Sequence, residues 1–497
     1  MSETAYDSVP YPGHVHTHTH PNRIAAVAQL FGIQAPSPAT ARVLEIGCGD
    51  GGNLISIAYT LPRSQCVGLD LAATAIERGR QHVKALALTN CDLVVADLAT
   101  VGRSLGQFDY VIAHGVYSWV PPPLRDALLQ LISDALSPSG VAFVSYNVFP
   151  GWRIAGMVRE MLRYHTLGID DPGERVEQAK ALLRFVAVAH DDDDPYGRLL
   201  AAECERVSGY PPWYLHHDDL ADVNDPVYFH EFVAQAKRFG LAFLAEADFA
   251  SMTGADLPKE ALEKLDELSG DPVLRGQYLD FVKCRRFRQS LLTHASHTAA
   301  PGPVRENVRT LLVASAAAPE TETVDLAAGI EVQFRWGQRA SLKTDHPLAK
   351  AAFLALRARW PEAMSFDELL TAVTRFGYGE IKADDALALE QVLVTAFGLR
   401  MVELTAEPWR AVAEPSPHPR ASAIARLEAA SSDVLTSLVH RRIRLDGSLA
   451  LNLLRLCDGS RNHQTLVDEL ARVDSAVTPD GLGNLLRGLT RTGVLEA

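Results

Sequence analysis

The sequence has few cysteines, and their spacing excludes the usual cysteine-based sites. Only six occur among 497 residues, and no two form a C-x-x-C pair. A structural zinc cluster or a redox dithiol needs such closely spaced pairs, and a small secreted disulfide scaffold needs a higher cysteine content. We therefore predict buried thiols in a reducing compartment and a cytoplasmic location.

Long apolar runs and excess positive charge are also missing. No stretch reaches the roughly 18 apolar residues that a membrane span needs, and no charged segment followed by an apolar one opens the chain. The net charge is −14, from 47 Lys and Arg against 61 Asp and Glu. We therefore expect no membrane span, no secretory signal and no general binding of nucleic acid, whereas a basic substrate would suit the charge.

The most informative stretch is a short apolar run that breaks into a glycine-rich turn, residues 43–54. After Asn53 the apolar residues recur at helical spacing, so we predict a strand, a tight turn and a helix. The turn glycines let the backbone approach a ligand closely: Gly47, Gly49 and Gly51. The carboxylates of Glu45 and Asp50 favour a ligand with cationic character over a pyrophosphate.

Further apolar strands are predicted to alternate with helices, at residues 66–70, 93–97, 108–113 and 141–146. This alternation is typical of an α/β fold with a parallel sheet covered on both faces. Asp70 and Asp97 end two of the strands. Asp70 lies about 20 residues past the turn, where such folds place a carboxylate on ribose hydroxyls. The ligand is expected beyond the carboxyl ends of the strands.

Together these motifs resemble the class I S-adenosylmethionine-dependent methyltransferases over residues 40–150. The resemblance implies a Rossmann-like fold. Residues 114–121, 145–152 and 216–300 are similar to bacterial methyltransferases that carry a methyltransferase regulatory domain, a group that includes protein-lysine methyltransferases acting on surface proteins. Thr19–Ala25 matches the end of that group's aromatic N-terminal arm, T-H-P-[DN]-R-[LI]-A.

The resemblance implies a binding site for S-adenosylmethionine. Glu45 and the turn glycines would hold its amino-acid end, Asp70 its ribose, and Asp97 with Leu98 its adenine. Both aspartates could instead cap the helices that follow their strands. The predicted cofactor contacts are Tyr11, Glu45, Gly47, Gly49, Asn53, Asp70, Leu71, Asp97, Leu98 and His114.

The acceptor side is predicted from the aromatic segments after the fourth and fifth strands. The resemblance places His114 at the mouth where the methyl group is transferred. Aromatic side chains there would suit a lysine ammonium, although they would equally suit a packed core: Tyr117, Trp119, Tyr146 and Trp152. Asn147 could bind the acceptor amine. The predicted catalytic residues are His114, Tyr117, Tyr146, Asn147 and Trp152.

This chain departs from one motif of amino-methyltransferases. Ala113–Val116 stands where many of them carry [ND]-P-P-[YF], so the acceptor atom stays open. We favour a protein lysine, and the alternatives are a small-molecule O- or N-methyltransferase and a non-catalytic cofactor-binding module. The intact glycine turn and both aspartates argue against the last alternative.

Histidines alternate along the N-terminal arm, at His14, His16, His18 and His20. An extended chain would place these imidazoles on one side, as a metal site requires. No cysteine or acid joins the cluster, so we predict an extended lid and no bound metal.

We predict five regions: an arm (1–40), the methyltransferase domain (41–165), a helical insertion with the regulatory domain (166–300), a linker (301–345) and a winged-helix-like region (346–497). Winged helices often bind DNA, but the acidic balance favours protein contact or scaffolding. The helices expected over residues 151–215 could pair with a second subunit, which would make a homodimer.

Overall fold

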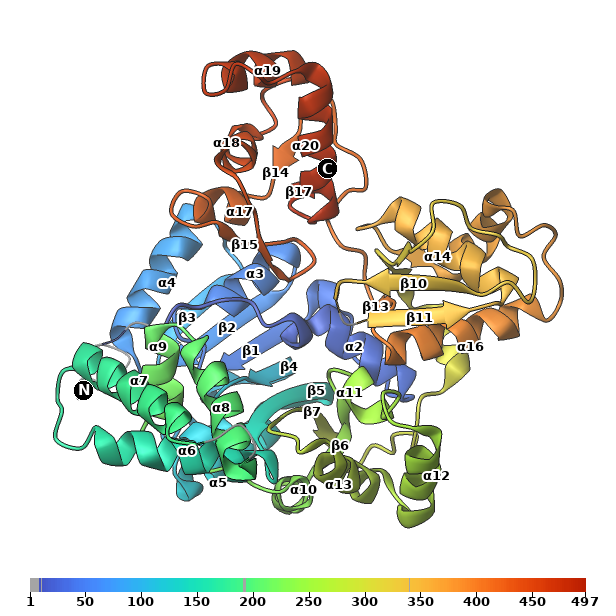
Figure 1. Ribbon diagram of the computed structural model, residues 1–497. Coiled ribbons are helices and arrows are strands. Elements are labelled where there is room, and N and C mark those ends of the chain that lie inside the picture. Colours follow the sequence, from blue (N-terminus) through green and yellow to red (C-terminus); the bar gives the residue numbers. More distant parts are fainter. Residues whose placement is uncertain (1–8, 10, 191–193, 339) are drawn as a thin grey trace.

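A seven-stranded sheet forms the centre of the computed structural model, which describes residues 9, 11–190, 194–338 and 340–497 (Figure 1). The strand order is β3-β2-β1-β4-β5-β7-β6; β7 is antiparallel to both neighbours and the other pairs are parallel. The predicted α/β fold is confirmed. The strands are β1 (Arg42–Ile46), β2 (Gln65–Asp70), β3 (Cys91–Val95), β4 (Phe108–Ala113), β5 (Leu136–Asn147), β6 (Leu241–Glu246) and β7 (Phe287–His294).

The alternation of side chains along the strands builds two cores, one on each face of the sheet. Val43 and Ile112 point into the core covered by α2 (Pro21–Leu30) and α3 (Gly52–Thr60). Their neighbours Leu44 and Val111 point into the opposite core. Helices α5 (Pro122–Ala135) and α10 (Phe229–Arg238) cover that second face, while α4 (Ala73–Ala85) packs beside β3. Both faces of the central strands are therefore buried, as their continuous apolar runs require.

Two strands of the sheet come from beyond residue 165. β6 and β7 lie within residues 241–294 and complete the edge next to β5. The boundary predicted at residue 165 therefore does not mark the end of the sheet. The sequence did not indicate that β6 and β7 belong to this sheet, because long-range antiparallel pairing at a sheet edge leaves no local sequence signal.

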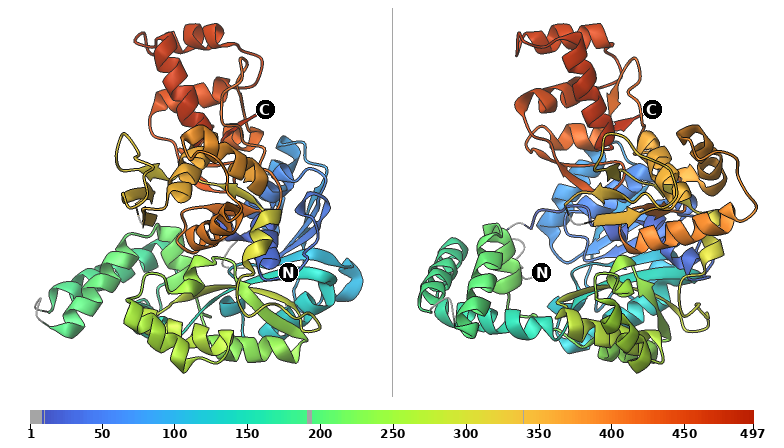
Figure 2. Two further views of the ribbon diagram at one scale, coloured as in Figure 1. Left: turned by 90° about the vertical axis from the view of Figure 1, so that its right-hand side faces the viewer. Right: turned by 45° about the vertical axis from the view of Figure 1, so that its right-hand side comes forward.

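Residues 151–215 are mostly helical, as predicted, and three of their helices project from the body of the molecule (Figure 2). They are α6 (Gly151–His165), α7 (Pro172–Val188) and α8 (Pro195–Ser208). The helices share a small core of their own, formed by apolar side chains such as Leu162, Leu183 and Leu200. Short α9 (Pro212–Tyr214) and the π-helical turn η5 (Leu215–Asp219) then lead the chain back toward the sheet.

The segment predicted as a linker, 301–345, is structured. It contains β8 (Leu312–Ala314), β9 (Ala318–Pro319), β10 (Val332–Trp336) and β11 (Ala340–Thr344). Near Trp336, β10 and β11 pair along their length. The strands in this proline- and alanine-rich segment are too short to show the alternation of apolar and polar residues that is typical of a strand, which is why its composition indicates a linker.

The C-terminal region forms two units of helices and short strands. In the first, β8 pairs with β12 (Met364–Ser365) and β13 (Glu403–Thr405), beside α14 (Pro347–Arg359), α15 (Phe366–Ala372) and α16 (Asp385–Gly398). The second unit sits over α3 and α4 (Figure 1). It contains β14 (Arg420–Ala421), α17 (Ala423–Glu428), β15 (Val434–Thr436), β16 (Arg442–Arg444), α18 (Ser448–Leu456), α19 (His463–Ala471), α20 (Pro479–Arg491) and β17 (Leu495–Glu496).

The remaining α-helices in the described ranges flank β6 and β7: α11 (Ala250–Thr253), α12 (Lys259–Leu268) and α13 (Pro272–Lys283). In those ranges, none of the helices combines the length and the apolar character that crossing a membrane would demand.

Candidate functional site

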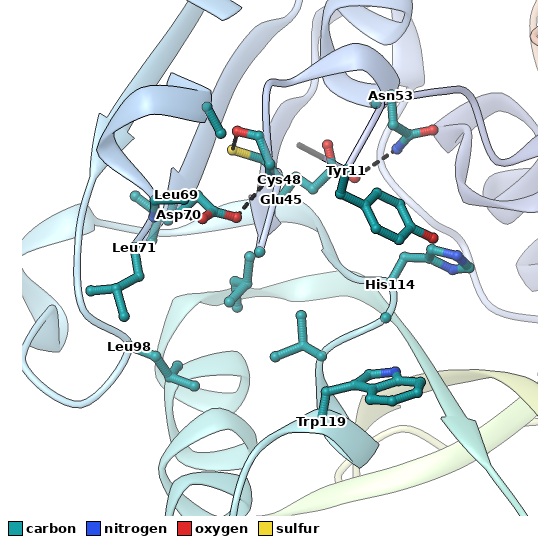
Figure 3. A pocket seen from close by; sticks show the side chains of 18 of the residues that line it. Tyr11, Glu45, Cys48, Asn53, Leu69, Asp70, Leu71, Leu98, His114 and Trp119 are labelled. Atoms are coloured by element: carbon teal, nitrogen blue, oxygen red, sulfur yellow. Dashed lines mark hydrogen bonds between the residues drawn. The ribbon is translucent and has the colours of Figure 1, made fainter. Parts of the chain in front are cut away.

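A cavity of about 340 Å³ opens beyond the carboxyl ends of β1, β2 and β4. Figure 3 shows Glu45 and Asn53 joined by a hydrogen bond at one part of its wall, with Leu71 and Leu98 elsewhere around it. The lining includes every predicted cofactor residue, namely Tyr11, Glu45, Gly47, Gly49, Asn53, Asp70, Leu71, Asp97, Leu98 and His114. The parallel sheet brings these residues together because its strand ends meet at one edge.

The glycine turn needs its glycines for two different reasons. Gly47 has φ +73°, and a Cβ added there would lie 2.5 Å from Cγ2 of Val116. Gly49 has φ +58°, and a Cβ there would meet nothing within 4 Å. The first glycine therefore permits close packing against the loop after β4, and the second leaves backbone open to the cavity.

Glu45 is a buried carboxylate with one oxygen free for a ligand. Its Oε1 accepts a hydrogen bond from Nδ2 of Asn53 at 2.8 Å. Its Oε2 is buried and has no hydrogen-bond partner among the described residues. Burial raises the pKa of Glu45 to about 8, and the nearby carboxylates of Asp70 and Asp50 add to that rise. Such a group would be satisfied by a cationic donor, which is the chemistry of the ammonium of S-adenosylmethionine.

The two strand-end aspartates face the cavity and also hold nearby backbone. Asp70 accepts hydrogen bonds from the amides of Gly49 (2.7 Å) and Ala72 (2.8 Å). Burial raises the pKa of Asp70 in spite of these bonds. Asp97 accepts one from the amide of Ala99 at 2.8 Å. The alternative from the sequence, that these aspartates cap the following helices, does not hold for Asp70, because the N-cap of α4 is Ala72.

Neutral histidines form the opposite wall. The rings of His14 and His16 are 4.6 Å apart, and those of His16 and His114 are 3.6 Å apart. Burial lowers the pKa of His114 to about 3 and that of His16 well below its usual value. Nδ1 of His114 is buried and lacks a hydrogen-bond partner in the described part of the chain. The wall therefore carries uncharged acceptors near neutral pH.

The regulatory region holds the N-terminal arm over this wall. The ring of Tyr11 packs edge-on against Trp213 at 4.7 Å and His217 at 5.6 Å. Nε2 of His217 lies 2.7 Å from the carbonyl of Val9. The rest of the predicted arm, residues 1–8 and 10, lies outside the described residues. Within them, no group of three or more His, Cys, Asp or Glu is placed to hold a metal ion.

Two of the predicted catalytic residues lie in the core, which corrects the prediction. Tyr117 and Tyr146 are at most 1% exposed and pack on Phe232. The hydroxyl of Tyr117 bonds Gln235 and that of Tyr146 bonds Ser290, so their polar ends are satisfied inside the protein. They cannot line an acceptor channel, and the packing alternative weighed from the sequence describes them.

The other aromatic and amide candidates divide between the cavity and its surroundings. Trp119 lines the cavity. Asn147 is buried; its backbone amide donates to Ser118 and its side-chain amide donates to Asn224. Trp152, at the start of α6, is half-buried and is not part of the lining.

Several lining residues carried no usable sequence signal. Arg78 on α4 and Asp218 on η5 both line the cavity. Asp218 lies in a segment that resembles the regulatory domain, but nothing in that resemblance placed it at the cavity. His14 and His16 were visible as an alternating pattern, but their packing against His114 was not.

Three families match parts of the chain. A "Methyltransferase domain" matches residues 43–140, a "Predicted methyltransferase regulatory domain" matches residues 211–294, and a "PKMT, C-terminal winged helix domain" matches residues 418–476. The last match confirms the predicted winged-helix character for that part of the C-terminal region.

Similar proteins come from Rickettsia. An uncharacterized protein of Rickettsia prowazekii is 33% identical over 371 residues, which is 73% of this chain and 67% of the relative. A second uncharacterized protein of the same organism is 36% identical over 238 residues, which is 48% of this chain and 95% of the relative. The solved structure of PKMT2 from Rickettsia typhi in complex with AdoHcy superimposes with a TM-score of 0.88 at 27% identity, covering 98% of this chain and 100% of that one.

Proposed function

Because this chain belongs to the S-adenosylmethionine-dependent methyltransferases that carry a methyltransferase regulatory domain and a PKMT winged helix, we propose that it methylates lysine side chains of proteins. The cofactor and the enzyme class follow from the family and from the similarity to a structure that contains AdoHcy. The protein-lysine acceptor is the proposal. The observation that carries it is the similarity to PKMT2 over 98% of the chain, accessory domains included.

The residues of the cavity suit the cofactor. S-adenosylmethionine carries its methyl group on a sulfonium. A nucleophile attacks the methyl carbon in line with the carbon–sulfur bond, which breaks and releases AdoHcy. We propose that Oε2 of Glu45 accepts a hydrogen bond from the cofactor's ammonium and that Asp70 binds its ribose hydroxyls. Leu71 and Leu98 supply apolar contact for the adenine, whose amine would be bound by Asp97. The buried, partnerless Oε2 of Glu45 supports this orientation.

The facing wall suits an amine acceptor. A lysine must lose its proton to water before its nitrogen can attack, and a nearby positive charge would repel the ammonium form that arrives. His16 and His114 are neutral because burial lowers their pKa values. We propose that Nδ1 of His114 accepts a hydrogen bond from the acceptor amine and so orients its lone pair. Trp119 offers an aromatic face to the ammonium as it enters.

Transfer of an isotope label tests the acceptor class. The purified enzyme is incubated with trideuteromethyl S-adenosylmethionine and a cell lysate, and tryptic peptides are analysed by mass spectrometry. We expect a mass gain on lysine Nζ that an Asp70→Ala control fails to produce. Label confined to the small-molecule fraction would replace our proposal with the alternative of a small-molecule O- or N-methyltransferase.

We also propose that the projecting helices α6–α8 pair with a second copy of the chain. They expose large apolar side chains that a monomer would leave in water: Tyr164 (79% exposed), Leu167 (72%), Phe185 (66%) and Val188 (81%). These side chains lie before the start and near the end of α7, and several large exposed apolar side chains on one projecting unit support an interaction site there. Light scattering should give the mass of a dimer, and Phe185→Glu should give the monomer. Val473→Glu, at an equally exposed site on another domain (65%), should leave the dimer intact; a monomeric wild type would refute the pairing.

We further propose a cytoplasmic location. It is supported by the six cysteines, all described and all free thiols, five of which are buried or half-buried. Location of the tagged enzyme by cell fractionation tests it, and recovery in a secreted or periplasmic fraction would contradict it.

A further inference from the structure

The helix that follows the glycine turn is covered by the C-terminal region along one face. Residues 53–60 of α3 are all buried. The side chains of Asn53, Ser56 and Tyr59 recur three residues apart and so lie on one side of the helix. The first two contact His440, and the Tyr59 hydroxyl bonds Glu496 at 3.3 Å. Elements nearly 400 residues later in the chain therefore pack against the start of the cofactor site.

His440 reaches this helix from the tip of a hairpin. Strands β15 and β16 pair with each other, and His440 lies in the turn between them with φ +53°. The turn is tied down because the guanidinium of Arg23 donates to the carbonyl of Val439 at 2.9 Å. His440 itself is completely buried, and its ring packs edge-on against His20 at 4.9 Å. Its position is therefore fixed from both sides.

The hydrogen bonds of Asn53 define which way its amide points. Its Oδ1 accepts from the Thr19 hydroxyl at 2.9 Å and from the backbone amide of His16 at 3.0 Å, and the amide is a group that can only donate. Nε2 of His440 lies 3.0 Å from the same oxygen and must also donate. Nδ1 of His440 is then free to accept from the Ser56 hydroxyl at 3.0 Å. Burial lowers the pKa of His440 to about 3, which keeps the ring in this neutral form.

With Oδ1 held in this way, Nδ2 of Asn53 is directed at Glu45. That amide donates to Oε1 of Glu45 at 2.8 Å, and Oε2 of Glu45 has no hydrogen-bond partner among the described residues. We propose that His440 is a positioning residue for cofactor binding: through Asn53 it holds Glu45 in the orientation that receives the cofactor's ammonium. The winged-helix unit thereby becomes part of the cofactor site without touching the cofactor. This inference rests on the proposed role of Glu45.

A double-mutant cycle read by calorimetric titration with S-adenosylhomocysteine tests the inference. His440→Ala should weaken binding about three- to tenfold, the value of one buried hydrogen bond. Asn53→Ala should weaken it at least as much, and the double variant should bind no more weakly than Asn53→Ala alone, because both changes break one chain of contacts. Additive losses, or an unchanged affinity of His440→Ala, would overturn the inference.

Two further variants separate positioning from loss of fold. His440→Gln places an amide donor near Oδ1 of Asn53 and shares the backbone strain of His440→Ala, so it should regain most of the affinity. Leu466→Ala opens a cavity in the core of the same C-terminal unit without contacting Asn53, and should lower the melting temperature with unchanged affinity. If His440→Gln binds S-adenosylhomocysteine as weakly as His440→Ala does, or if Leu466→Ala also binds it more weakly than the wild type, His440 acts only through stability.

If the wild type itself fails to bind S-adenosylhomocysteine, the proposed cofactor site is wrong. If the wild type and His440→Ala bind it equally well, only the role of His440 is refuted.

Discussion

The two walls of the cavity are built in different ways. The wall that we propose receives the cofactor consists of a glycine turn and the carboxylates Glu45, Asp70 and Asp97, all within one continuous βαβαβ segment. The facing wall consists of rings from the arm and from the loop after β4. The arm is held there by Trp213, by His217 and by hydrogen bonds to the segment around the glycine turn. The donor side is therefore determined by local backbone geometry, while the acceptor side depends on how distant segments dock.

The largest effect should follow from breaking the cofactor wall at Gly47. Gly47→Ala combines a left-handed backbone with a clash against Val116, at a cost of about 2–5 kcal/mol in unfolding free energy. Urea denaturation measures the loss, and calorimetry should show a cofactor affinity at least tenfold lower. Gly32→Ala has a similar φ of +81° but no neighbour within 4 Å, so it should keep its affinity. Equal affinities in the two variants would contradict a role of this turn in binding.

Removing the carboxylate of Asp70, the proposed ribose ligand, should have the next largest effect. Asp70→Ala loses the bond to the Gly49 amide together with the proposed ligand contacts, so the dissociation constant should rise about 10- to 100-fold. Asp222→Ala removes an equal charge from a side chain that is 93% exposed and should change nothing. Unchanged binding by Asp70→Ala would place the ribose elsewhere.

Glu45 should make the ligand-free enzyme less stable as the pH rises. Its folded-state pKa of about 8 lies above the unfolded value of about 4.3, so the folded state binds the proton more tightly between these pH values. Stability should therefore fall by up to about 1.4 kcal/mol per pH unit from pH 6 to 8. Glu45→Gln should remove this slope in thermal unfolding and weaken cofactor binding. An identical slope in both proteins would show that Glu45 is already ionised.

The smallest effects are expected from two aromatic residues that the sequence predicted for the acceptor side: Trp119, which lines the cavity, and Tyr146, which is buried in the core. Trp119→Ala should raise the KM for a methyl-accepting protein about 3- to 30-fold, because an aromatic contact to the ammonium is lost. Tyr146→Phe should leave KM and kcat unchanged and cost about 1 kcal/mol of stability, through the lost bond to Ser290. Steady-state kinetics and denaturation measure both. If Tyr146→Phe raises the KM for the methyl-accepting protein, the ring of Tyr146 does line the acceptor channel.

The sequence could predict the cofactor wall because strand ends and glycine turns are local signals. Glu45, Asp70 and Asp97 each end or nearly end an apolar run, and a parallel sheet brings such positions to one edge. Tyr117 follows β4 and Tyr146 lies near the end of β5, yet both pack against Phe232 on α10. The side on which these two rings pack depends on α10, which lies more than 80 residues later in the chain. His440 shows the extreme case, since only the docked hairpin brings it to Asn53.

A crystal structure of the enzyme with S-adenosylhomocysteine tests the account most directly, because it locates every part of the cofactor at once. We predict the amino group within hydrogen-bonding distance of Oε2 of Glu45, the ribose hydroxyls on Asp70, and the adenine between Leu71 and Leu98. The sulfur should then face His114 and Trp119 across the cavity. A cofactor bound in the reverse direction, or with its amino group away from Glu45, would contradict the division of the site into these two walls.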